Sequence, residues 1–145
     1  MRIRPILLLS ALVVVAAGCG SGEPATPMSG AATTTTINAG PDLSKADFAD
    51  ETGKTAVGVK ARDNAFETQY IEVSPGTKVT FTNEGEQPHN IKPANEGAFK
   101  PVETLDFEPT ETTTITFDEP GEYSYYCSLH GTPTKGMTGS IRVVG

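Results

Sequence analysis

From position 55 onward, apolar and polar residues alternate in short segments, as in strands that bury one face. Val79 and Phe81 share one face of such a segment, and Tyr123, Tyr125 and Cys127 share one face of another. No stretch carries the longer period of an extended helix. The pattern predicts strands at residues 55–61, 70–73, 78–83, 89–92, 102–107, 112–117, 121–127 and 139–144.

Turn-forming residues separate these segments. Proline fixes φ and glycine accepts positive φ in three of the connections, Ser74-Pro75-Gly76, Asn83-Glu84-Gly85 and Glu119-Pro120-Gly121. About eight short strands in such a length predict an all-β fold in which two sheets form a β-sandwich. The alternation places the side chain of Cys127 on the core side of its strand.

The N-terminal third has a different composition and predicts no core. Basic residues in 1–4 precede an apolar segment at 6–17 that is too short for a comfortable membrane span, and small residues follow directly. This order is typical of a secretory signal, which we assign to residues 1–18. Residues 19–53 are rich in Gly, Ser, Pro, Ala and Thr and are expected to form a flexible tether before a domain at 54–145.

The first cysteine lies at the end of the predicted signal. Ala16-Ala17-Gly18-Cys19 resembles the lipobox of bacterial lipoproteins, although Ala16 stands where leucine is commonest. The resemblance implies that Cys19 is lipidated and that the exported protein is anchored to the cell membrane, facing the periplasm or the exterior. The alternative is ordinary cleavage, which leaves Cys19 as a spare thiol. A disulfide from Cys19 to Cys127 is disfavoured because it would crosslink a flexible tract and constrain little.

Soft metal-binding side chains are few and concentrated. The chain has two histidines, two cysteines and three methionines, of which His89, Cys127, His130 and Met137 fall in the predicted domain. A thiolate, two imidazoles and a thioether together favour copper over harder cations. Each residue alone has an ordinary alternative: either histidine could lie in a surface loop, and Cys127 or Met137 could simply fill the core.

The charge balance is acidic. The sequence has 18 acidic and 11 basic residues, a formal net charge of −7. Removal of Arg2 and Arg4 with the signal would leave nine basic residues and a charge near −9. Such a chain would be repelled by nucleic acid, and its charge suits either attraction toward a basic protein partner or solubility alone.

Two long segments resemble the cupredoxins, in the branch of the small plastocyanins, amicyanins and pseudoazurins. The first runs from Ile71 to Ile91 and includes Pro88-His89-Asn90, and the second is Phe117 to His130. The resemblance implies a Greek-key β-sandwich with one mononuclear type 1 copper site. It implies the ligands His89, Cys127, His130 and Met137, and hydrogen bonds from Asn90 and Ser128 that join the two ligand loops.

The same resemblance implies a carrier of single electrons rather than an enzyme, with the exposed edge of His130 as the electron port and another redox protein as partner. Six residues separate His130 from Met137, more than is usual in the small cupredoxins, so the axial distance stays open. Two alternatives also stay open. One is a copper storage or delivery protein in the periplasm or at the cell surface, and the other is an interaction module in which copper is incidental.

Overall fold

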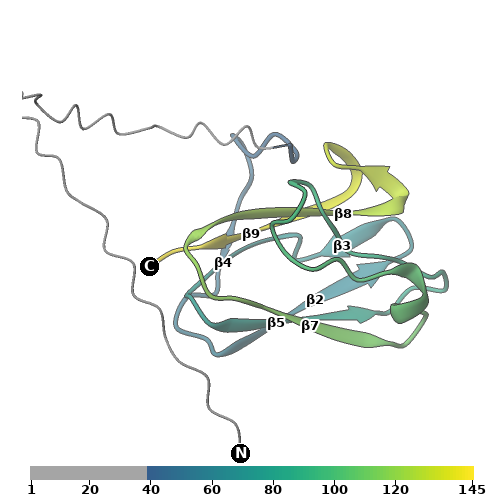
Figure 1. The fold of residues 1–145 in the computed structure, drawn as a ribbon, viewed down its shortest axis with the longest axis horizontal. Coiled ribbons are helices and arrows are strands. Elements are labelled where there is room, and N and C mark those ends of the chain that lie inside the picture. Colours follow the sequence, from purple (N-terminus) through teal and green to yellow (C-terminus); the bar gives the residue numbers. More distant parts are fainter. Residues whose placement is uncertain (1–38) are drawn as a thin grey trace, which may run out of the picture. The chain divides into compact units, whose positions relative to one another are not determined.

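Two facing β-sheets make up the part of the protein that the structure, a computed structural model, describes, namely residues 39–145 (Figure 1). The predicted signal at 1–18, Cys19 and the tether residues 19–38 lie outside the described residues. No helix within the described range is long and apolar enough to cross a membrane.

The sheets contain five and four strands. In order across the first sheet the strands are β1 (Ala49–Asp50), β4 (Tyr70–Val73), β9 (Lys135–Val143), β8 (Gly121–Thr132) and β6 (Lys92–Pro93). In order across the second sheet they are β3 (Ala65–Glu67), β2 (Ala56–Arg62), β5 (Thr77–Asn83) and β7 (Thr112–Phe117). A single 3-10 turn, η1 (Thr104–Asp106), is the remaining element of residues 39–145. The prediction of an all-β sandwich is confirmed.

The core lies between the sheets and is built from the alternating positions. Val79 and Phe81 of β5 are fully buried, as are Tyr125 and Cys127 of β8. The ring centroid of Tyr125 lies 5.3 Å from that of Phe81 and 4.9 Å from that of Phe66, both in edge-to-face geometry. Such aromatic pairs add stability beyond the area they bury. Cys127 therefore sits at the rim of a packed aromatic cluster, on the face that alternation predicts.

The structure differs from the predicted strands around His89. Residues 89–91 and 103–107 are not strands, since β6 holds only Lys92 and Pro93, and Ile91 and Val102 form an isolated bridge. The two segments touch through a few backbone bonds, too few for a ladder: the N–H of His89 donates to the carbonyl oxygen of Phe107, and Ile91 and Val102 exchange a pair of bonds.

The hairpin of β8 and β9 is longer than predicted. The strand β8 continues past Cys127 to Thr132, and β9 begins at Lys135 instead of residue 139. Sequence alternation fails here because the pairing register shifts between Tyr126 and Gly131. The hairpin tip therefore extends beyond the two ends of the predicted strands.

Residues 39–53, which composition places in the tether, make specific contacts with the sandwich. The short strand β1 pairs in parallel with β4, with Ala49 opposite Ile71. The guanidinium of Arg142 lies 3.7 Å from the ring centroid of Phe48. The backbone N–H of Ala39 donates to the Asn95 side chain over 2.8 Å. Ordered contacts thus begin before the first strand that alternation predicts.

We predict that Gly139→Ala destabilises the domain by about 2 kcal/mol or more, because overpacking a filled core is costly. A Cβ at this position would lie 2.6 Å from the carbonyl oxygen of Gln69 and would overlap the Tyr125 ring. Urea unfolding measures the change. Gly58→Ala is the control, since its Cβ would meet nothing closer than 4.0 Å. Equal stability of the two variants would contradict this packing.

Candidate metal centre

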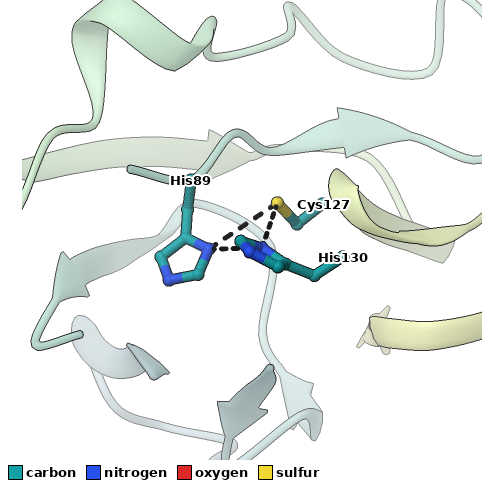
Figure 2. A group of neighbouring side chains, drawn as sticks. All are labelled: His89, Cys127 and His130. Atoms are coloured by element: carbon teal, nitrogen blue, oxygen red, sulfur yellow. Dashed lines mark hydrogen bonds between the residues drawn. The ribbon is translucent and has the colours of Figure 1, made fainter. Parts of the chain in front are cut away.

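Three donor atoms from two separate segments meet at one end of the sandwich (Figure 2). The Cys127 sulfur lies 3.5 Å from Nδ1 of His130 and 3.7 Å from Nδ1 of His89. The two Nδ1 atoms are 3.2 Å apart. His89 and Cys127 are fully buried, whereas His130 is half-buried. The structure thus brings together three of the residues that the sequence singled out.

The spacing of these atoms fits a small metal ion. The point equidistant from all three lies inside their triangle and about 2.0 Å from each, close to the metal–nitrogen bond lengths of protein zinc sites. A central position within a triangle of one sulfur and two imidazole nitrogens is the trigonal arrangement of blue-copper sites. Both the types of donor atom and their spacing are therefore compatible with a copper ion.

An irregularity in the β8–β9 ladder directs Cys127 and His130 to the same place. Tyr126 pairs with Thr138, and the next pair is Gly131 with Gly136, so residues 127–130 lie opposite Met137 alone. Such bulges bend a strand and redirect its side chains. Two residues three positions apart can therefore face one point, which regular alternation would not allow.

Met137 lies at the strand position that faces this bulge. Its side chain is fully buried, and it follows Gly136, whose φ is +84°. Backbone of this kind suits glycine, since a side chain there is strained. The burial of Met137 agrees equally with the core residue and with the ligand that the sequence left as alternatives.

The Asn83 side chain holds the loop that leads to His89. Its Nδ2 donates to the carbonyl oxygens of Gln87 at 2.9 Å and Phe107 at 3.1 Å, and its Oδ1 accepts from the N–H of Gly85. Asn83 is fully buried, so these bonds are shielded from water. Sequence reasoning identified the turn at 83–85 but missed this role, although an asparagine at the start of a turn is the usual signal for it.

Asn90 and Ser128 connect the two segments that carry the donors. Oδ1 of Asn90 accepts from the N–H of Ser128 at 2.8 Å, and its Nδ2 lies 2.9 Å from the Ser128 hydroxyl oxygen. The same Nδ2 lies 3.2 Å from the hydroxyl oxygen of Thr104 in η1. The residue after His89 is thus bonded to the residue after Cys127, and neither segment can shift without breaking these bonds.

The surroundings of His89 favour its neutral form. Burial lowers the pKa of His89 below its usual 6.5, the nearby His130 lowers it further, and Asp63 acts in the opposite direction. Neutral imidazole is the form that binds metals, because protonation removes the lone pair. Among residues 39–145, the buried Nε2 atom of His89 has no hydrogen-bond partner.

Comparison with known proteins identifies the family. The profile described as "Copper binding proteins, plastocyanin/azurin family" matches residues 53–144. The chain belongs to this family. The resemblance to cupredoxins is therefore confirmed, and copper is the metal of the family. His89, Cys127 and His130 form a group that could hold one copper ion.

Individual members of the family are similar over most of this domain. The chain is 39% identical to plastocyanin from Solanum crispum over 88 residues, which is 54% of this chain and 87% of plastocyanin. A mutant of amicyanin in the Cu(I) form superposes with a TM-score of 0.53 at 26% identity, over 62% of this chain and 83% of amicyanin. A copper-containing nitrite reductase from Thermus scotoductus superposes with a TM-score of 0.51 at 31% identity, over 62% of this chain but 22% of the enzyme.

We predict that Asn90→Ala destabilises this cupredoxin domain by about 1–3 kcal/mol without copper, because the Ser128 N–H and two hydroxyl groups lose their partner. In the copper-loaded protein the visible spectrum and reduction potential should also shift. Chemical unfolding and voltammetry measure the two effects. Thr114→Ala, which removes one exposed hydroxyl contact, is the control. An Asn90→Ala variant with unchanged stability and potential would show that the bridge has no such role.

We also predict that the copper-free domain loses stability as the pH falls below about 6.5. Because the pKa of His89 is lowered on folding, the unfolded chain binds more protons in this range, and unfolding is favoured at lower pH. Urea unfolding between pH 7 and pH 5 measures the slope. His89→Gln should weaken the dependence of the unfolding free energy on pH. The same dependence in both proteins would show that other groups cause it.

Proposed function

We propose that this protein carries single electrons through one type 1 copper ion held by Nδ1 of His89, Sγ of Cys127 and Nδ1 of His130. Met137 is the proposed axial ligand, supported by its burial opposite the bulge. The observation that supports the proposal most strongly is the convergence of the three donor atoms within 3.7 Å of one another. Bound copper supplies a centre that alternates between Cu(I) and Cu(II).

Rigid positioning of the donors suits electron transfer. Cys127 is anchored by the buried middle of β8, and His89 is anchored through the hydrogen bonds of Asn83 and Asn90. A donor set held by its protein frame changes little when the charge of the ion changes, which keeps the reorganisation during each transfer small. The protein contributes this rigidity, together with exclusion of water from the buried sulfur.

Exposure singles out His130 as the proposed electron port. It is half-buried, whereas His89 and Cys127 are fully buried, so its ring is the shortest connection from the site to the surface. Leu129 beside it exposes 51% of its surface, and Gly131 and Pro133 add uncharged surface. We expect a redox protein to dock here, and the acidic net charge of −7 favours a partner with a basic surface.

A carrier agrees better with the comparisons than an enzyme does. Plastocyanin and amicyanin match over 87% and 83% of their own lengths, so the likeness covers most of each protein. The likeness to nitrite reductase covers 22% of that enzyme and supports the sandwich fold without its activity. We therefore propose no catalytic residue.

The decisive test is to add Cu(II) to the copper-free protein and record the visible spectrum, followed by voltammetry. We predict one equivalent of copper, an intense thiolate-to-copper band and a reversible one-electron wave. Cys127→Ser should lose the band and the wave, because it removes the sulfur donor. Met137→Leu should keep the band and shift the potential. A colourless complex would overturn the type 1 assignment, and an irreversible wave with labile copper would indicate storage or delivery.

Export and membrane anchoring through Cys19 are proposed on the sequence of residues 1–19 alone. Mass spectrometry of the membrane fraction should find a lipid-modified N-terminus at Cys19. An unmodified chain in the soluble fraction would overturn this part of the proposal.

A further inference from the structure

The outer nitrogen of His89 lacks the partner that a metal-binding histidine usually has. Figure 2 shows Nδ1 of His89 turned toward Cys127 and His130, with the second ring nitrogen on the far side of the ring. That atom, Nε2, is buried without a hydrogen bond to any part of the chain that the structure describes. Ligating histidines almost always interact through their other N–H with a carboxylate, a carbonyl or water, which fixes the tautomer. An unpartnered buried nitrogen here therefore needs an explanation.

A charged group on that side of the ring is found beside Gly85. A Cβ built on Gly85 would lie 3.2 Å from Nε2 of His89 and 3.0 Å from Oδ1 of Asp63. These two atoms are therefore at most about 6 Å apart, within the range in which a charge affects its neighbour. Because residue 85 is a glycine, no side chain of that residue stands between the Asp63 carboxylate and the His89 ring.

Asp63 is held in place by the backbone of the loop that leads to His89. Its Oδ1 accepts a hydrogen bond from the N–H of Glu86 over 3.0 Å. Within residues 39–145, no lysine or arginine is within ion-pair distance of Asp63, whereas its neighbour Arg62 pairs with Glu67 and Glu84. The carboxylate of Asp63, an exposed residue, thus lies near His89 without a neutralising ion pair among the described residues.

We propose that Asp63 is a positioning residue for the copper site, which acts through His89. Its negative charge holds the proton of the neutral ring on Nε2 and so leaves the Nδ1 lone pair directed at the metal. The same charge stabilises Cu(II) relative to Cu(I), because the more positive ion gains more from it. The raising effect of Asp63 on the His89 pKa is in keeping with this coupling. The inference rests on the proposed copper site and adds a residue that neither the donor set nor its hydrogen bonds include.

Asp63→Asn tests the proposal, because an amide keeps the shape and the acceptor oxygen while it removes the charge. In the copper-loaded protein we expect the stability of Cu(I) relative to Cu(II) to rise two- to tenfold, which voltammetry reads as an increase of about 18–59 mV. Asp63→Glu should keep a potential near that of the unmodified protein. Asp118→Asn makes the same charge change just before β8, whose first residue, Gly121, is roughly 20 Å along the strand from Cys127. Equal shifts in the two Asn variants would overturn the proposal.

A second measurement does not require copper. Nitrogen NMR of the imidazole groups in the copper-free protein should show His89 with its proton on Nε2, and Asp63→Asn should shift that resonance or populate the other tautomer. An unchanged His89 spectrum would overturn the role of Asp63. Failure of the intense copper band would instead overturn the proposed function and leave this result intact, so the two failures are distinguishable.

Discussion

The hydrogen bonds between Asn90 and Ser128 are the connection on which the site depends. His89 belongs to a loop before β6, and Cys127 and His130 belong to the bulged part of β8, so the covalent chain alone does not bring the donors together. The Asn90 side chain bonds to both the N–H and the hydroxyl of Ser128. Because these bonds join the residues that directly follow His89 and Cys127, a displacement of either loop would break them.

The remaining structure supports that connection from both sides. On one side, Asn83 holds the approach to His89 through carbonyl groups of Gln87 and Phe107. On the other, the aromatic cluster around Tyr125 packs the part of β8 just before Cys127. Densely packed side chains have little room to move, so donor atoms attached to this packed frame are held rigidly. Both the family assignment and this rigidity support the proposed electron carrier.

Much of the fold and the donor set could be predicted from sequence, for physical reasons that apply to some elements and not to others. Alternation identified β5 and the first half of β8, because one face of each is buried against the other sheet. It failed at residues 128–132, where the bulge interrupts the period of two, and at 89–91, where a few isolated backbone bonds stand in place of a ladder. The donors were found because soft side chains are rare in this chain.

Contacts between distant segments were beyond sequence reasoning. Nothing in the local pattern distinguishes Asp63 from the other acidic residues, and its position beside His89 depends on the turn at Gly85. The contact of Phe48 with Arg142 was missed for the same reason, since a polar segment with few large apolar residues does not indicate where it will pack. Such contacts depend on how the backbone folds, so local patterns in a single sequence do not predict them.

The central claim is that the protein frame, not the metal, sets the donor positions. Crystal structures of the domain without copper, with Cu(I) and with Cu(II) test it most directly. We expect all three structures to keep the separations of 3.2, 3.5 and 3.7 Å among the His89, His130 and Cys127 donor atoms, within about 0.5 Å. A copper-free structure in which His89 or His130 moves away by more than about 1 Å would contradict it.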